Sequence, residues 1–167
     1  MSAKKTTTEH AALIGIGSNI DPEKNIRKAV NLLAQEVEIV ACSRVWQNPA
    51  IGSDGPDYLN AAITIRSQYQ AQDLKNCLLL PLEARLDRVR KENKNADRTI
   101  DLDILIFDDR ALDEELWTQA HVSVPSAELM PGFQHPVTGE SLRQAADRLI
   151  PDDHFFLRDD LDLCSLH

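Results

Sequence analysis

The alternation of apolar and polar residues along the chain predicts four strands and two main helices. Residues 13–17 form a short apolar run, which is typical of a buried strand. A helix is expected from Pro22 to about Gln35, because apolar residues recur there at helical spacing and Asp21 is a favourable N-cap. Alternation over residues 37–46 then predicts a second strand.

The second half of the pattern repeats this order. It predicts a strand at Tyr58–Ile65, a helix from Ala71 to about Arg88 and a strand at Arg98–Phe107. We expect a kink or a break at Pro81, because proline removes a backbone donor from a helix. The whole order is typical of an α/β (α+β) ferredoxin-like sandwich, a four-stranded antiparallel sheet with helices packed on it and mobile loops. An extended piece at residues 122–125 and a short helix at residues 141–149 should follow.

Length and composition indicate one domain. The 167 residues are 43% hydrophobic, which is enough for a single core, expected over residues 11–150 between a flexible tail (1–10) and a C-terminal tail (151–167). The formal charge of −9 opposes binding to nucleic acid. No apolar run approaches the length of a membrane span, so we expect a cytoplasmic monomer that contacts no membrane.

The cysteines give no sign of a disulfide framework. Cys42, Cys77 and Cys164 are odd in number and widely separated. We therefore expect three unpaired thiols.

Two acids in an otherwise apolar strand form the most informative feature of the sequence. Asp101 and Asp103 should share one face of their strand, where a cation would offset their repulsion. Mg²⁺ is the obvious candidate, and Arg98 is placed to take a phosphate bridged by the metal. The alternative is the solvated face of an edge strand. The continuously apolar residues 104–107 argue against that alternative, because they indicate a strand covered on both faces.

Two further groups of residues fit a ligand site. Basic residues crowd the end of the second helix and lead towards the acidic pair, an arrangement that suits phosphate binding. The alternative is that these cations only interact favourably with the helix dipole. Tyr58 and Asn60 should project together just after the loop Asn48–Asp57, a plausible mobile lid. The Asn60 amide could read a flat heterocycle or could bond a neighbouring loop.

These motifs resemble the 6-hydroxymethyl-7,8-dihydropterin pyrophosphokinases of folate biosynthesis. The resemblance runs from about Ala12 to Phe133 and rests on Gly17–Asn19, Pro56–Ala62, Arg88–Arg90 and Arg98–Leu105. It implies transfer of pyrophosphate from ATP to a hydroxymethyl pterin with two Mg²⁺ ions, and small molecules as the only partners. The roles that it implies are catalysis for Arg88 and Arg98, ATP binding for Glu83, Arg90 and Ser123, pterin binding for Asn48, Tyr58, Asn60 and Phe133, and metal binding for Asp101 and Asp103.

The sequence departs from the family at two places. Asn95-Ala96-Asp97 stands where the family usually carries Trp-Gly-Pro, and Ser126-Ala127-Glu128 stands in place of a His-centred nucleotide segment. We therefore expect a slow enzyme that binds pterin normally and nucleotide weakly. The alternative is a paralogue that binds pterin or nucleotide with little or no catalysis.

Overall fold

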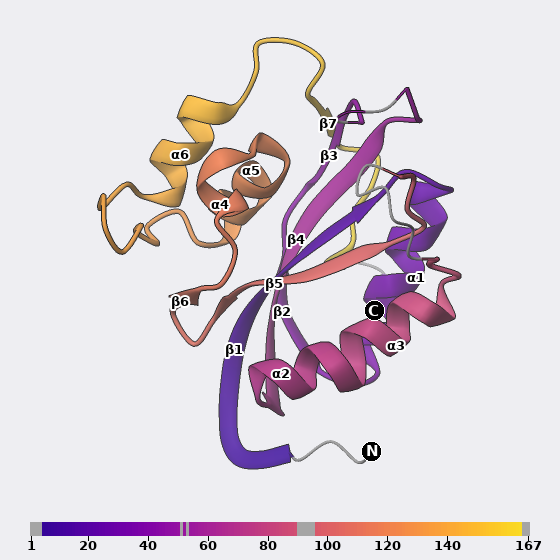
Figure 1. The fold of residues 1–167 in the computed structure, drawn as a ribbon, viewed down its shortest axis with the longest axis vertical. Helices are drawn as coiled ribbons and strands as arrows, with labels where there is room; N and C mark the ends of the chain where they lie inside the picture. The colour runs from indigo at the N-terminus through magenta and orange to yellow at the C-terminus, as the bar shows by residue number, and fades with distance from the viewer. Residues whose placement is uncertain (1–4, 51, 53, 90–95, 165–167) are drawn as a thin grey trace.

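The computed structural model describes residues 5–50, 52, 54–89 and 96–164 (Figure 1). Its centre is one antiparallel sheet in the order β6-β5-β1-β4-β3-β7, with β2 also paired to β4. The strands are β1 (Lys5–Ser18), β2 (Glu38–Cys42), β3 (Val45–Asn48), β4 (Tyr58–Tyr69), β5 (Asp101–Phe107), β6 (Arg110–Ala111) and β7 (Phe156–Arg158). An antiparallel sheet with covering helices is confirmed, but the expected count of four strands is wrong.

The expected second strand is two strands in the structure. Ser43 interrupts it, because the Ser43 hydroxyl accepts a hydrogen bond from the Ala62 amide at 2.8 Å. In a regular β-ladder the acceptor of that bond would be a backbone carbonyl. β2 lies before this point and β3 after it, and both pair with β4.

One face of the sheet carries the main core. It is covered by α1 (Pro22–Ala34) and by a second helix made of α2 (Ala71–Asp73), the π-helical stretch η1 (Leu74–Leu79) and α3 (Leu80–Arg85) (Figure 1). The irregular stretch comes directly before Pro81, and a widened turn there relieves the clash between a proline ring and the preceding turn. The helix ends at Arg85, earlier than expected, and Asp87 follows with a left-handed φ of 63°.

The start of α1 differs from the expected cap. Pro22 does open the helix, but Asp21 has φ 41° and its side chain makes no cap hydrogen bond. The Asn25 side chain instead donates to the carbonyl of Ile20 at 2.6 Å. The start of α1 is thus stabilised by a side chain inside the helix rather than by the side chain of its N-cap residue.

Three short helices cover part of the opposite face. They are α4 (Glu115–Thr118), α5 (Ala120–Leu129) and α6 (Leu142–Leu149), and they enclose a second apolar cluster around Trp117 and Leu105 (Figure 1). The extended piece expected at residues 122–125 is wrong, because this segment lies inside α5. Its β-branched residues favour a strand, but burial against β4 and α6 overrides that preference.

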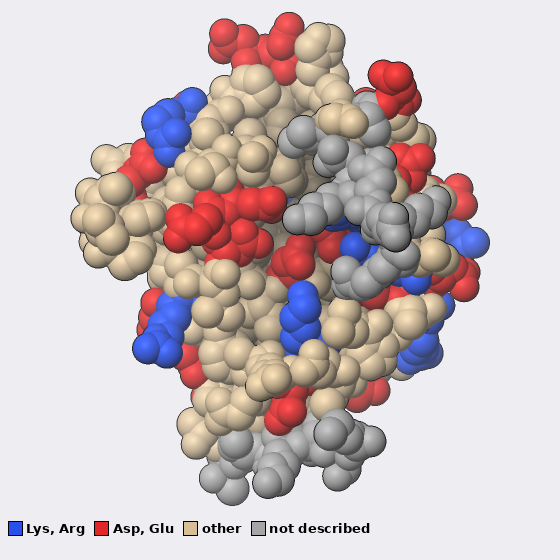
Figure 2. Space-filling model, in the orientation of Figure 1, with Lys and Arg blue, Asp and Glu red and all other residues tan. Residues whose placement is uncertain are grey.

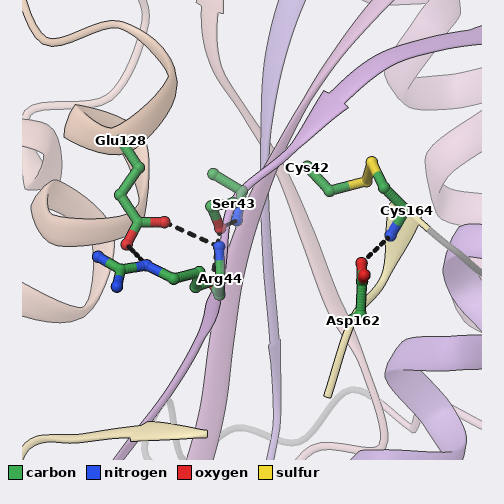
Figure 3. The surroundings of a disulfide bond; sticks show 7 residues. Cys42, Ser43, Arg44, Glu128, Asp162 and Cys164 are labelled. Atoms are coloured by element: carbon green, nitrogen blue, oxygen red, sulfur yellow. Dashed lines mark hydrogen bonds and ion pairs between the residues drawn. A yellow bond between two sulfur atoms is a disulfide. The ribbon is translucent and has the colours of Figure 1, made fainter. Parts of the chain in front are cut away.

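α5 is fastened to the sheet by one carboxylate. Glu128 accepts hydrogen bonds from the Arg44 backbone N–H and Nε, both at 2.8 Å (Figure 3). It also accepts one from Trp46 Nε1 at 3.2 Å. Arg44 begins the approach to β3, so this contact sets the position of α5 over the edge of the sheet.

Both ends of the chain differ from the expected tails. β1 begins at Lys5, which pairs with Tyr69, and β7 pairs with β3 near the other end. Leu161 and Leu163 are buried in the main core. Residues 5–10 and 156–158 thus pair in the sheet, and Leu161 and Leu163 pack in its core.

The expectation of three unpaired thiols is wrong. Cys42 in β2 and Cys164 form a disulfide with a Cα–Cα distance of 5.6 Å, and Cys77 is unbonded (Figure 3). The two bonded residues are 122 positions apart, and only the return of the chain past β3 brings them together. The disulfide thus ties the C-terminal segment to the sheet.

Candidate active site

Strand register gathers the functional side chains on one face of the sheet. Gly17 of β1 lies opposite Asp101 on one side and Asn60 on the other, and Gly15 lies opposite Asp103. Directly opposed residues of antiparallel strands point to the same face. The predicted sharing of one face by Asp101 and Asp103 is therefore correct, and glycines form the floor between them and Asn60.

A cavity of about 450 Å³ lies over this floor, beside α4 and α5. Its wall contains nine residues that are polar or charged, together with Gly15, Gly17 and apolar residues. The polar and charged wall residues are Asn48, Tyr58, Asn60, Arg98, Asp101, Asp103, Glu115, Gln119 and His121. Acids, a cation and amides thus face one space.

The amide end of the cavity is fixed by three residues. The Asn60 Nδ2 donates to Oδ1 of Asn48, and both side chains are buried. The Asn48 Nδ2 donates to the carbonyl of Pro49 at 3.1 Å. Tyr58 is the register partner of Asn48, and burial raises the pKa of its phenol. This end presents a rigid set of donors and acceptors of the kind that reads a flat heterocycle.

Asp101 is held by two arginines. Arg88 donates to its Oδ1 at 2.6 Å and Arg98 to its Oδ2 at 2.8 Å. Burial works to raise the pKa of Asp101, but the hydrogen bond from Arg88 and the charges of both arginines outweigh it and lower the pKa. Asp101 is therefore ionised.

The pKa of Asp103 is shifted in the opposite direction. Burial and the charge of Asp101 raise the pKa of Asp103 to about 7, and Lys75 Nζ, 3.8 Å from its Oδ1, opposes this rise only in part. Asp103 also borders a second cavity of about 420 Å³, lined by Lys75, Ile104 and Leu112 among others. Figure 2 shows acidic side chains gathered near the centre of this view, with basic side chains beside them.

The acidic pair fits a hard divalent cation. A bound cation would relieve the repulsion that raises the pKa of Asp103, and Mg²⁺ takes one or two carboxylates together with water and phosphate oxygens. In the described part of the chain no group of three or more His, Cys, Asp or Glu could hold a metal ion. A metal at Asp101 and Asp103 would thus need oxygens from a substrate.

Glu83 lies beneath the cavity rather than in its wall. Arg88 Nη1 donates to Glu83 Oε2 at 2.6 Å, and the Leu102 amide donates to the same oxygen at 3.3 Å. The side chains of Glu83 and Arg88 are only 3% and 8% exposed. Glu83 therefore holds Arg88 towards Asp101, and it is not among the residues that line the two cavities.

The strand-end motif Gly17–Asn19 joins the loops on either side of the site. The Asn19 Nδ2 donates to Asp97 at 2.8 Å and to the carbonyl of Pro56 at 3.2 Å, while its Oδ1 accepts from the Arg98 amide at 2.7 Å. Asn19 is 1% exposed. It thereby sets the positions of the residues that lead to Asp101 and to Tyr58.

The α4–α5 wall supplies residues that sequence reasoning missed. Glu115, Gln119, His121 and Val122 all line the cavity. Burial raises the pKa of Glu115, with Asp113 adding to the shift, and burial lowers the pKa of His121. Nothing in their spacing indicates a site, because they reach it only when this segment folds over the sheet.

Two predicted ligand contacts fall elsewhere. Ser123 is fully buried within α5 and does not line either cavity. Phe133 packs on Trp117 in the second apolar cluster, with ring centroids 6.1 Å apart. The position of Ser123 follows from the helical form of residues 120–129, and that of Phe133 from its packing in the second apolar cluster. The predicted ATP residue Arg90 lies outside the described residues.

Comparison with known proteins shows the family of this chain. The sequence model described as 7,8-dihydro-6-hydroxymethylpterin-pyrophosphokinase (HPPK) matches residues 13–131. The chain belongs to the HPPK family. It is 32% identical over 151 residues to the 2-amino-4-hydroxy-6-hydroxymethyldihydropteridine pyrophosphokinase of Synechocystis sp., covering 84% of this chain and 76% of that one. The Bacillus subtilis enzyme of the same name is 30% identical over 150 residues, covering 83% and 89%.

Solved structures of HPPK proteins share the fold. Wild-type Plasmodium falciparum HPPK-DHPS with pteroate matches with a TM-score of 0.67 at 9% identity, covering 89% of this chain and 43% of that one. This HPPK chain therefore spans less than half of that solved chain. In the described part of the chain, no helix is both long and apolar enough to cross a bilayer.

Proposed function

We propose that this chain catalyses the Mg²⁺-dependent transfer of pyrophosphate from ATP to 6-hydroxymethyl-7,8-dihydropterin, a step of folate biosynthesis. Family membership supports the type of reaction. The observation that carries the proposal is that Asp101, Asp103 and the Asn60 amide line a single cavity. Such a site offers a phosphate-bridging metal position and a heterocycle-reading position within one space.

The two cavities suggest where the two substrates lie. The pterin would occupy the first cavity, with its donors and acceptors at Asn48 and Asn60 and its ring beside Tyr58. The nucleotide would enter from the second cavity, where apolar Ile104 and Leu112 lie near Lys75. Asp103 borders both cavities, so the phosphates would cross at the acidic pair. Glu83 would then contribute by holding Arg88 rather than by touching ATP.

The reaction joins the hydroxyl oxygen of the pterin to the β-phosphorus of ATP. The bond from this phosphorus to the oxygen bridging it to the α-phosphate breaks, AMP leaves with the bond electrons, and the O–H bond of the pterin hydroxyl breaks with release of its proton. Two Mg²⁺ ions at Asp101 and Asp103 would supply neutralisation of the phosphate charge. Transfer of this kind needs little covalent chemistry from the protein, so alignment and charge stabilisation are its main contributions.

The two arginines would have different roles, and Arg98 would act on the transferring group. In the structure Arg98 and Arg88 both contact Asp101. Arg98, with a side chain 30% exposed, can exchange this carboxylate for a phosphate oxygen, because guanidinium groups bind both in the same fork geometry. Arg88, which is almost fully buried, would keep Asp101 ionised and oriented.

Slow turnover is part of the proposal. Position 95 carries Asn where the family usually carries Trp, and burial of a tryptophan is worth about 1.5 to 3 kcal/mol of closure. A site that closes less often turns over more slowly. Ser126, which replaces the family's His-centred segment, is fully buried and borders neither cavity. Weak nucleotide binding would follow from that loss.

The test is AMP release from ATP with 6-hydroxymethyl-7,8-dihydropterin, with and without Mg²⁺. We expect release that needs both the pterin and the metal, and that is lost in Asp103→Ala while the fold remains. Calorimetry with the pterin alone separates the alternative function. Pterin binding without AMP release would show a binding paralogue, and absence of both would overturn the proposal.

A further inference from the structure

A chain of polar contacts crosses the back of the sheet behind the pterin end of the cavity. Arg158 of β7 donates through Nη2 to Glu23 at 2.6 Å and through Nη1 to Oε1 of Gln47 at 3.1 Å. Gln47 in turn donates through Nε2 to Oδ2 of Asp57 at 3.0 Å. Arg158 is oriented by its two bonds to Asp160, at 2.9 Å and 2.8 Å.

The chemistry of each member suits its place. Gln47 has a donor, Arg158, on one side and an acceptor, Asp57, on the other, so only a side chain with one acceptor and one donor end satisfies both. The hydrogen bonds to Asp160, then to Glu23, raise the pKa of Arg158, which stays charged. The Arg158 side chain is 25% exposed, so its charged hydrogen bonds are partly shielded from solvent.

The position of Gln47 links this chain of contacts to the site. Gln47 pairs with Leu59, which is buried in the main core, so the two residues lie on the face away from the cavity. The next pair in the same ladder is Asn48 with Tyr58, and both of these residues line the cavity. Asp57 directly precedes Tyr58. The Gln47–Asp57 bond therefore closes the β3–β4 ladder at the pair that forms the cavity wall.

We infer that Arg158 and Gln47 are positioning residues for the pterin end of the site. They hold the Asn48–Tyr58 pair from the face away from the cavity. Through Asn48, whose Oδ1 accepts a hydrogen bond from Asn60 Nδ2, they also hold the Asn60 amide. The inference rests on the proposed function, because it names the pterin as the ligand whose binding depends on this alignment. C-terminal residues far from the cavity thus take part in substrate recognition.

The sharpest test reverses the polarity of one contact. Gln47→Glu keeps an acceptor for Arg158 but places a second carboxylate against Asp57. Adding Asp57→Asn restores a donor on the other side, so the double variant Gln47→Glu with Asp57→Asn rebuilds both contacts. Gln35→Glu, at an exposed residue after α1, adds the same charge elsewhere and serves as the control.

Two measurements separate this inference from the proposed function. Calorimetry with 6-hydroxymethyl-7,8-dihydropterin should show binding weakened roughly three- to tenfold in Gln47→Glu, restored in the double variant and unchanged in the control. Amide hydrogen exchange of residues 58–60 without ligand should be faster in Gln47→Glu and normal again in the double variant.

Each outcome decides one of the two claims. Equal pterin affinity in the wild type and Gln47→Glu would overturn the inference, as would a double variant that stays as weak as the single one while melting normally. A wild type that binds no pterin, while exchange still follows the predicted order, would overturn the proposed function and leave the alignment role of Gln47 supported.

Discussion

Gly17 and Asn60 face each other across the β1–β4 ladder so closely that a side chain at position 17 would crowd the Asn60 amide. A Cβ atom at position 17 would lie 3.0 Å from Oδ1 of Asn60. Asn60 has little room to yield, because it is 6% exposed and its Nδ2 is bonded to Asn48. The glycine is thus part of the shape of the amide end of the cavity.

Gly17→Ala should therefore weaken pterin binding more than it weakens the fold. The added methyl group must shift the Asn60 amide by a few tenths of an ångström, which strains its contact with Asn48 and moves the groups that face the ligand. We expect a loss of about 1 to 3 kcal/mol in pterin binding, measured by calorimetry. Gly132→Ala is the matched control, since a Cβ there meets nothing within 4 Å. Equal losses in both variants would contradict this account of Gly17.

The core of the fold could be predicted because the apolar residues of each predicted element recur with the spacing of a helix or of a strand. The centre of the sheet, β5-β1-β4 with β2 and β3, contains the four expected strands. The split at Ser43 has no such signal, since a hydroxyl that replaces a ladder carbonyl leaves the alternation unchanged. The disulfide could not be predicted either, because the proximity of Cys42 and Cys164 depends on the C-terminal pairing of β7 with β3.

The site could be predicted as far as it lies on strands. Side-chain alternation alone brings Asp101 beside Asp103 and Tyr58 beside Asn60. His121 was missed because it enters the cavity from a helix that lies over the sheet. The β-branched residues of its segment favour an extended strand, but tertiary packing makes the segment helical.

The raised pKa of Asp103 predicts a dependence of stability on pH. The pKa is about 7 in the folded protein against an ordinary value of 3.8, so the folded state binds the proton more tightly than the unfolded state does. Stability should thus fall as the pH rises from about 4 to about 7 and stay lower above pH 7. Because 41% of the Asp103 side chain is exposed, solvent reduces the effect to about 1 kcal/mol.

Asp103→Asn should remove this dependence. We expect the variant to be more stable than the wild type at pH 8 and equally stable at pH 4, as measured by urea unfolding without metal. Asp109→Asn is the control, because Asp109 is exposed with φ 65° and asparagine accepts that conformation. The account of Asp103 would be contradicted if the free energies of unfolding of the wild type and of Asp103→Asn differed by the same amount at pH 4 and at pH 8. The Asp103 carboxyl would then titrate normally.

The buried pair of Arg88 and Glu83 allows stability and catalysis to be separated. Arg88→Met should lower the free energy of unfolding by about 3 to 5 kcal/mol, because Glu83 is left charged at 3% exposure. Adding Glu83→Gln removes that charge and should recover most of the stability in urea unfolding. AMP release should nevertheless remain absent, since Asp101 has lost its Arg88 contact.

The control for this pair is Arg85→Met, an exposed residue at the end of α3. We expect that variant to unfold within about 0.5 kcal/mol of the wild type. Recovery of AMP release in Arg88→Met with Glu83→Gln would show that Arg88 serves only to neutralise Glu83.

The disulfide provides the last prediction, because it closes most of the chain into one loop. Cys42 and Cys164 are 122 residues apart, and cross-links over loops of this size stabilise proteins by about 2 to 4 kcal/mol. Cys164→Ser should therefore lower the free energy of unfolding by that amount under oxidising conditions, and a thiol reductant should bring the wild type to the level of the variant. Cys77→Ser is the matched control, since Cys77 is unbonded. If Cys164→Ser and Cys77→Ser unfold alike in the absence of reductant, the bond does not hold the C-terminal segment, and the burial of Leu161 and Leu163 alone must do so.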